Sequence, residues 1–150
     1  MAAADEEKII VGVDGSDASI EALRQGARRA KALGTRLEAW GCWEYPAGYE
    51  GYLAMGVEGF AHEAEENLEH AVGEVFGPER PRYLTVRPVH GSARTALVDG
   101  SRRASLLVVG RRGRGGFAGL LLGSVSAACV SHAQCPVLVV HSPRAEARDT

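Results

Sequence analysis

Residues 106–113 read LLVVGRRG, and after nine further residues the chain continues with Gly123-Ser124. A short apolar run that leads into glycines, followed by a helical pattern, predicts a buried strand, a loop and a helix in that order. Glycines allow backbone N–H groups to close around phosphate oxygens, and the N-terminus of a helix adds positive potential. The stretch therefore predicts an α/β fold with a phosphate-binding loop between a strand and a helix.

The charges around this loop favour an anionic ligand. From Ser101 to Ala145 there are six arginines and neither aspartate nor glutamate, although the whole chain has a net charge of −2. Arg111, Arg112 and Arg114 lie in the loop, where each could contact phosphate or belong to a solvated basic surface. A local positive field suits a small anion, so we expect no general nucleic-acid binding. One Arg-Gly-Gly copy beside a strand is weak evidence for RNA binding.

The glycine spacing differs from two other phosphate-binding motifs. A Walker A loop ends in Lys and then Ser or Thr, whereas Gly116-Phe117 occupy these positions. The glycines from Gly113 onward imitate a dinucleotide fingerprint, but no acidic residue follows about twenty residues later to bind a ribose hydroxyl. Without a Walker lysine or a water-positioning base, we expect no fast turnover of a bound phosphate ligand and assign no catalytic residue.

Strands and helices alternate along the rest of the chain. Continuous apolar runs predict strands at 9–13, 37–43, 84–89, 106–109 and 136–141. Apolar residues at helical spacing predict helices from a cap at Ser16 or Asp17 to Leu33, and over 60–76, 93–101 and 123–133. This alternation predicts βαβ units and a parallel sheet.

Two of these strands end in residues suited to a ligand. Asp14 ends the first strand and Gly110 ends the fourth. Ligands of parallel sheets bind beyond the carboxyl ends of the strands, where the strand order reverses, so neighbouring strands here would give one crevice. Asp14 could accept hydrogen bonds from ribose hydroxyls, reach a metal beside the phosphates, or simply end the strand in an Asp-Gly turn. Ser124 suits a helix N-cap, a phosphate contact or both.

The segment Pro46–Gly59 is rich in glycine and tyrosine and has no clear period, which predicts a surface loop or lid. Aromatic residues gather in and before it, namely Trp40, Trp43, Tyr45, Tyr49 and Tyr52. We expect them to pack in the core or the lid, although one of them could stack on a purine base. His90 is expected in a turn.

The cysteine content and the N-terminus favour a cytoplasmic protein. Cys42, Cys129 and Cys135 cannot all pair within one chain and have no dense spacing, so we expect reduced thiols. Cys129 and His132 share a helix face, but a structural zinc needs four ligands, so no metal site is expected there. The acidic N-terminus lacks the apolar region of a signal peptide, and no apolar run approaches the ~20 residues of a membrane span.

Several motifs together resemble the universal stress protein family, specifically its nucleotide-binding branch. They are VGVDGS at 11–16, Val89-His90-Gly91, Gly110-x2-Gly113-x9-Gly123-Ser124, and CPVLVV at 135–140. The spaced glycines match the family's ATP-binding signature completely. The similarity covers a single expected domain at 8–141, with flexible tails at 1–7 and 142–150.

The resemblance implies a Rossmann-like, three-layer α/β/α sandwich of the adenine nucleotide alpha hydrolase type. Its five-stranded parallel sheet would have the order 3-2-1-4-5, which makes the first and fourth strands neighbours. It also implies ATP, with or without Mg²⁺, in the crevice, and a homodimer paired through the final edge strands. The expected function is a nucleotide-dependent sensor or regulator of the stress response with an unidentified regulatory protein partner.

Carried over by position, the resemblance implies cofactor-binding roles at three places. Val13 and Asp14 would line the adenine-ribose end, with Cys42 near the base. Ribose and phosphates would be held by Gly110, Gly113, Gly123, Ser124 and Val125. Further phosphate contacts are expected from Arg111 and Ser126.

Three alternatives to this reading stay open. The first is a slow ATPase or phosphotransferase on the same fold, and the second is a protein-interaction module whose loop is empty. RNA binding is the third and would have a steep salt dependence.

Overall fold

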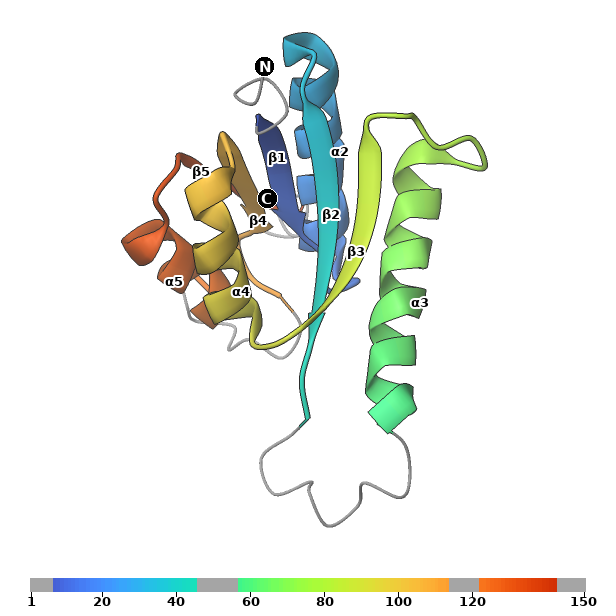
Figure 1. Cartoon of the computed structure of the whole chain (residues 1–150), viewed down its shortest axis with the longest axis vertical. Helices are drawn as coiled ribbons and strands as arrows, with labels where there is room; N and C mark the ends of the chain where they lie inside the picture. Colours follow the sequence, from blue (N-terminus) through green and yellow to red (C-terminus); the bar gives the residue numbers. More distant parts are fainter. Residues whose placement is uncertain (1–6, 46–56, 114–121, 143–150) are drawn as a thin grey trace, which may run out of the picture.

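The computed structural model of the chain describes residues 7–45, 57–113 and 122–142. Five parallel strands form one sheet in the order β3-β2-β1-β4-β5 (Figure 1). The strands are β1 (Lys8–Gly12), β2 (Arg36–Trp43), β3 (Leu84–His90), β4 (Leu106–Gly110) and β5 (Val137–Val140). The helices are α2 (Asp17–Leu33), α3 (Val57–Phe76), α4 (Ala93–Gly100) and α5 (Ser124–His132), and α4 continues into the 3-10 turn η2 (Ser101–Arg103).

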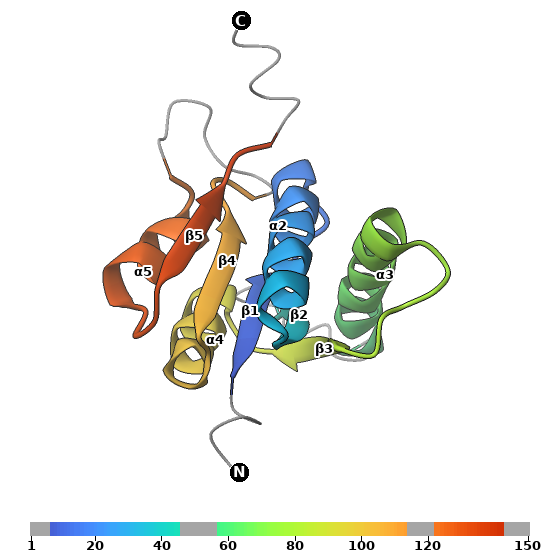
Figure 2. The ribbon, with the colours of Figure 1, turned by 90° about the horizontal axis from the view of Figure 1, so that it is seen from above.

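Helices cover both faces of this sheet. α2 and α3 lie on one face, and α4 and α5 lie on the other (Figure 2). The predicted three-layer, Rossmann-like fold and the predicted strand order are therefore confirmed. β1 and β4 are neighbours, with Ile9 opposite Leu106 and Val11 opposite Val108. The strand order thus reverses between β1 and β4.

Each face of the sheet has its own apolar core, because successive side chains of a strand point to opposite faces. The core under α2 and α3 includes Ile9, Val11, Leu23, Leu68 and Val72. The core under α4 and α5 includes Ile10, Leu97, Leu107, Val109 and Cys129. Burial on both faces explains why β1 and β4 read as continuous apolar runs.

The ends of α2 follow local chemistry. The Ser16 Oγ accepts the N–H of Ser19 at 3.2 Å, which satisfies one free donor of the first turn. Gly34 has a φ of 67° and its N–H donates to the carbonyl of Ala30, which closes the last turn. Of the two caps predicted for this helix, Ser16 is the one observed, and the predicted end at Leu33 is confirmed.

Two helix boundaries differ from those that periodicity predicts. α3 begins at Val57, so 57–59 of the expected loop Pro46–Gly59 are helical, while 46–56 lie outside the described residues. Glycine is less favourable than alanine in a helix by about 1 kcal/mol, so Gly59 argues against a helix at this position and the first turn of α3 was not predicted. Ser101 is not the last residue of α4 but begins η2, where its buried Oγ donates to the carbonyl of Val98 and accepts the N–H of Gln134 at 2.9 Å.

Within the part of the chain that the structure describes, every helix is too short or too polar to cross a bilayer. The predicted tails, apart from Glu7 and Ser142, fall outside the described residues.

Candidate functional site

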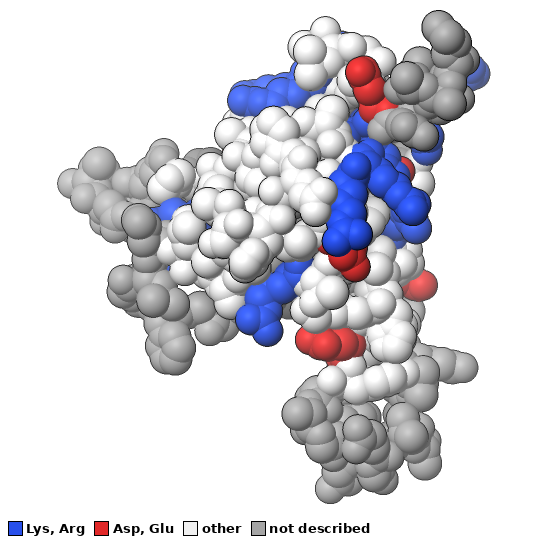
Figure 3. All heavy atoms as spheres, turned by 60° about the vertical axis from the view of Figure 1, so that its left-hand side comes forward, with Lys and Arg blue, Asp and Glu red and all other residues white. Residues whose placement is uncertain are grey.

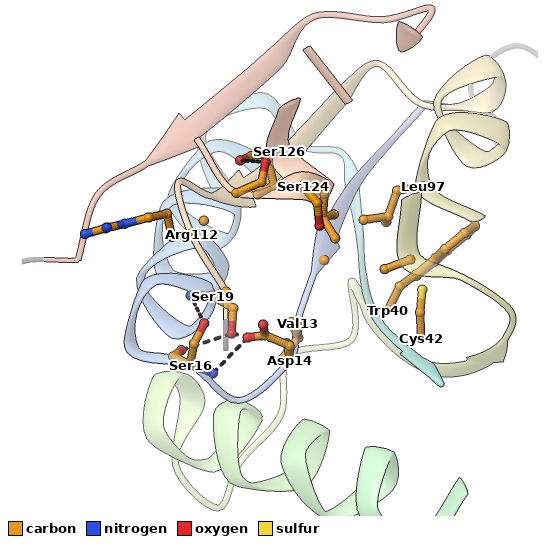
Figure 4. A pocket seen from close by; sticks show the side chains of 17 residues that line it. Val13, Asp14, Ser16, Ser19, Trp40, Cys42, Leu97, Arg112, Ser124 and Ser126 are labelled. Atoms are coloured by element: carbon orange, nitrogen blue, oxygen red, sulfur yellow. Dashed lines mark hydrogen bonds between the residues drawn. The ribbon is translucent and has the colours of Figure 1, made fainter. Parts of the chain in front are cut away.

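A cavity of about 190 Å³ opens at the carboxyl ends of β1 and β4. β1 leads into α2 on one face of the sheet, and β4 leads through the glycine loop into α5 on the other face. The two connections therefore diverge and leave a crevice between them. Figure 4 shows Val13, Asp14, Ser124 and Ser126 around this cavity.

The turn from β1 to α2 fixes the carboxylate of Asp14. The Asp14 Oδ1 accepts the N–H of Ser16 at 2.9 Å, and the Asp14 N–H donates to the Oγ of Ser19 at 3.2 Å. Gly15 has a φ of 86°, a conformation that favours glycine in this turn. These contacts hold an exposed carboxylate at the mouth of the cavity.

The glycines of the loop are required by close contacts. A Cβ atom on Gly110 would lie 2.8 Å from the Cβ of Ala18, because the end of β4 packs directly on α2. A Cβ atom on Gly113 would collide with Oδ2 of Asp14. A Cβ atom on Gly123 would lie 3.3 Å from the Cα of Arg112. Any larger residue would therefore shift the walls of the cavity.

The two ends of the loop meet at the carbonyl of Arg111. This oxygen accepts the N–H of Gly123 at 2.8 Å and the Oγ of Ser126 at 2.6 Å. Gly123 is the N-cap of α5 and brings no side-chain cap, so the first turn of α5 presents backbone N–H groups at the cavity. Such N–H groups and the helix dipole attract an anion.

The opposite end of the cavity is apolar. Trp40, Leu97 and Val109 form its wall together with Ala93 and Cys42. Figure 4 shows Trp40, Cys42 and Leu97 on one side and Ser16 and Ser19 on the other. The cavity therefore has one wall suited to a flat organic ring and one suited to phosphate.

The thiol of Cys42 belongs to the apolar wall. Burial, followed by the nearby Cys129, raises the pKa of Cys42 to about 11. The pKa of Cys129 is likewise raised to about 11 by burial and by Cys135. Both thiols stay protonated at neutral pH and pack as small apolar groups.

Trp40 is held in place by a buried carboxylate. Its Nε1 donates to Oε1 of Glu38 at 2.9 Å, and the guanidinium of Arg87 lies 5.1 Å from the centre of its ring. Glu38 also pairs with Lys8 at 3.2 Å and with Arg87 at 3.3 Å. Burial opposes ionisation, but the bond from Trp40 and the pairing with Lys8 outweigh it and lower the pKa of Glu38. Figure 3 shows basic side chains in several separate groups around a broad uncharged surface, with acidic side chains beside some of them.

The other described aromatic residues near the end of β2 do not line this cavity. Trp43 stacks on His90 with ring centres 4.3 Å apart, and Tyr45 meets Trp43 and Phe60 edge to face. His90 is the last residue of β3 rather than a turn residue. Trp40 is therefore the aromatic residue beside the cavity, while Tyr49 and Tyr52 lie outside the described residues.

The structure brings most of the residues predicted for the site together. The cavity is lined by Val13, Asp14, Cys42, Gly110, Gly113, Gly123, Ser124, Val125 and Ser126. Arg111 does not line it, whereas Arg112 does, and in Figure 4 the Arg112 side chain extends away from the cavity. The prediction missed Gly12, Ser16, Ser19, Trp40, Ala93, Leu97 and Val109 as lining residues.

Some of these missed residues carried a signal and others did not. Ser16 was predicted as a cap, and a cap beside a strand end already lies at the crevice. Ala93 and Leu97 come from α4, and nothing in their local spacing indicates that α4 reaches the end of β1. Within 7–45, 57–113 and 122–142, no three His, Cys, Asp or Glu side chains are grouped to hold a metal ion.

Comparison with known proteins supports one family. The model of the universal stress protein family matches residues 6–141. Universal stress protein Rv1996 of Mycobacterium tuberculosis is 33% identical over 150 residues, covering 88% of this chain and 47% of the relative. Universal stress protein MJ0531 of Methanocaldococcus jannaschii is 28% identical, covering 93% of this chain and 85% of the relative. The chain thus spans about half the length of the mycobacterial relative.

Solved structures give the same result for the fold. Universal stress protein UspA from Lactobacillus plantarum matches with a TM-score of 0.75 and 22% identity, over 91% of this chain and 99% of that one. A universal stress protein solved in complex with cAMP matches with a TM-score of 0.69 and 27% identity, over 91% and 97% of the two chains.

Proposed function

This chain belongs to the universal stress protein family, and from that premise we propose that its crevice between β1 and β4 binds an adenine nucleotide. ATP is the expected ligand, and the proposed nucleotide-binding domain spans 8–141. The protein would act as a nucleotide-dependent regulator in the stress response rather than as a fast enzyme.

The observation that carries this proposal is the polarity of the cavity. Trp40, Leu97 and Val109 offer an apolar wall to a base. Across the cavity, the glycine loop and the uncapped first turn of α5 offer backbone N–H groups to phosphate. A nucleotide likewise has a flat base at one end and negatively charged phosphates at the other. The solved relative in complex with cAMP, at 27% identity, supports an adenine nucleotide in particular.

Each end of the nucleotide has residues suited to it. Val13 and Cys42 would contact the base, with the carboxylate of Asp14 near the ribose. The phosphates would meet backbone groups of Gly110, Gly113, Gly123, Ser124 and Val125. Gly110 and Gly113 bring no side chain into the cavity, and a Cβ atom at either position would collide with α2 or with Asp14. The Arg112 side chain, which extends away from the cavity in Figure 4, would reach the phosphates by a change of rotamer.

The same site also suits Mg²⁺ bound together with the phosphates. Mg²⁺ in nucleotide sites takes one or two carboxylates and keeps waters and phosphate oxygens as its other ligands. Asp14 supplies one carboxylate beside the glycine loop. The ion would neutralise phosphate charge next to this carboxylate.

Slow turnover follows from the lining residues. Asp14 is the single carboxylate among the described residues that line the cavity, and they include neither lysine nor histidine. The lysine of P-loop enzymes and a histidine base therefore have no counterpart among these described residues, which supports binding without fast hydrolysis. A binding protein that senses nucleotide level needs no such groups.

We further propose that the protein is a cytoplasmic homodimer with a regulatory protein partner. β5 is at the edge of the described sheet, where a second copy could add its own β5. The three unpaired thiols suit a reducing compartment.

Isothermal calorimetry with ATP, ADP, AMP and cAMP tests the proposal. We expect saturable binding to the natural chain and none to Gly113→Val, because the branched side chain would displace Asp14 and fill the phosphate space. Gly73→Val is the matched control, since a Cβ atom on Gly73 meets nothing within 4 Å.

The alternatives give different results. Equal heats of nucleotide binding for the natural chain and for Gly113→Val would contradict the proposed site. The absence of any nucleotide binding would also contradict it and would favour a protein-interaction module. Product formation faster than about 1 per second would favour an enzyme instead. Equal dimer affinity with and without saturating ATP would remove the proposed regulatory step.

A further inference from the structure

We propose that Ser126 is a positioning residue of the nucleotide loop, whose hydroxyl holds the two ends of the loop together without touching phosphate. This inference rests on the proposed nucleotide binding, since it assigns how one residue of that site acts. Ser126 lies on the first turns of α5 beside Ser124, as Figure 4 shows. It is a polar side chain in a buried place, with only 2% of its surface exposed.

The hydroxyl of Ser126 already has an acceptor. Its Oγ lies 2.6 Å from the carbonyl oxygen of Arg111 and 3.1 Å from that of Gly123. A serine hydroxyl has one proton, so it donates to one oxygen at a time, and the shorter distance favours Arg111. The carbonyl of Gly123 also accepts a hydrogen bond from the N–H of Ala127 at 2.9 Å.

The peptide groups around Arg111 form the base of the loop. The Arg111 N–H donates to the carbonyl of Val140 at 2.7 Å, which ties it to the end of β5. The Arg111 carbonyl accepts both the N–H of Gly123 and the hydroxyl of Ser126. The chain thus leaves Arg111, runs through the loop and returns to the same carbonyl.

This arrangement conflicts with a direct phosphate contact from Ser126. Phosphate oxygens need donors, and the one donor of Ser126 is engaged with Arg111. The remaining lone pairs of the hydroxyl would repel a phosphate oxygen. Ser124 differs, because it is exposed at the cavity and is the first residue of the uncapped turn. Ser124 therefore suits the phosphate and Ser126 suits the loop.

Removal of the hydroxyl should loosen the loop without unfolding the domain. In Ser126→Ala the Arg111 carbonyl keeps the N–H of Gly123, so no buried acceptor is left without a partner. Alanine also has a higher helix propensity than serine, which favours α5. The loop base would have one hydrogen bond in place of two.

The test compares ligand-free proteolysis with nucleotide affinity in the full chain. Trypsin cleaves after Arg111 and Arg112 at the start of the loop, and mass spectrometry identifies the fragments. We expect ligand-free Ser126→Ala to be cut there about fivefold faster than the natural chain and to bind ATP about fivefold more weakly, as loss of one hydrogen bond predicts. Ser126→Thr keeps the hydroxyl and should restore both values.

Two further variants separate the possible roles. Ser124→Ala should bind ATP more weakly but be cut at the natural rate when ligand-free, because it touches phosphate only. Ser131→Ala, on the exposed side of α5, should change neither value. Thermal melting checks that each variant is folded, and Ser126→Cys, of nearly the same size but a weaker donor, replaces Ser126→Ala if the latter is unfolded.

Cleavage of ligand-free Ser126→Ala, or of Ser126→Cys where it replaces Ser126→Ala, at the natural rate would overturn the inference, whatever the affinity of the variant for ATP. If the natural chain binds no nucleotide, the proposed function fails. The cleavage rates then still decide whether Ser126 holds the loop.

Discussion

The carboxylate of Asp14 lies directly against Gly113, so that any side chain at Gly113 would collide with Oδ2 of Asp14. The two residues belong to different sides of the crevice, one at the end of β1 and the other in the loop after β4. Their contact means that the width of the crevice depends on both residues at once. Substitutions at the two positions should therefore be coupled.

Gly113→Ala should lower the free energy of unfolding by about 1 kcal/mol, because the exposed Asp14 carboxylate must move to make room and thereby loses its hydrogen bond from the Ser16 N–H. Asp14→Ala removes the colliding oxygens, so Gly113→Ala should cost clearly less in that background. Urea unfolding of the two single variants and the double variant measures the coupling. Equal costs in both backgrounds would contradict the contact, and Gly73→Ala serves as the uncrowded control.

Glu38 should make stability depend on pH. Because its pKa is lowered in the folded state, the stability it contributes is present above its unfolded value of about 4.5 and is lost as the pH falls through the lowered folded value. Glu38→Gln should cost about 1–3 kcal/mol at pH 7, since the Lys8 and Arg87 charges lose their partner but Arg87 is half exposed.

The same variant should also flatten the loss of stability below pH 5. Urea unfolding at pH 3.5, 5 and 7 measures this for the natural chain, for Glu38→Gln and for the exposed control Glu65→Gln. A Glu38→Gln curve parallel to that of the natural chain would show that Glu38 does not titrate with folding.

Cys42 should react slowly with iodoacetamide. With a pKa of about 11, its thiol is about one hundredfold less ionised at pH 8 than a thiol with the ordinary value of 9.0. ATP should slow the reaction further by covering the apolar wall. Peptide mapping after timed labelling gives the rate, and Cys42→Ser identifies the peptide. A rate equal to that of free cysteine would mean that the thiol is not buried.

Trp40 should report nucleotide binding by fluorescence. It lines the cavity, whereas Trp43 stacks on His90 away from it. The ATP-induced change in emission should persist in Trp43→Phe and vanish in Trp40→Phe. If the change follows Trp43 instead, the base does not occupy the apolar wall.

Local chemistry was sufficient to predict the elements that have clear signals. Ser16 and Gly34 delimit α2 because a cap and a left-handed glycine act within a few residues. The first turn of α3 was missed because Gly59 interrupts its pattern. The order of the strands is a long-range property, and it followed from the family resemblance rather than from periodicity.

The candidate site was predictable where its residues adjoin strand ends or glycines. Asp14 and Gly110 illustrate this, because the carboxyl end of a parallel strand is a known location of ligands. The contribution of Leu97 could not be predicted, since it depends on how α4 packs over β1. The hydrogen bond from Ser126 to Arg111 could not be predicted from the sequence either, because it joins residues on either side of the loop.

The N–H of Arg111 donates to the carbonyl of Val140, and the carbonyl of Arg111 accepts the N–H of Gly123 and the hydroxyl of Ser126. Arg111 thereby connects the end of β5 with the base of the glycine loop. The bond between Arg111 and Val140 extends the pairing of β4 with β5 by one residue, so the position of the loop base depends on the position of β5. By linkage, a ligand in the crevice and a partner bound along β5 that are coupled through this bond would change each other's affinity by the same factor.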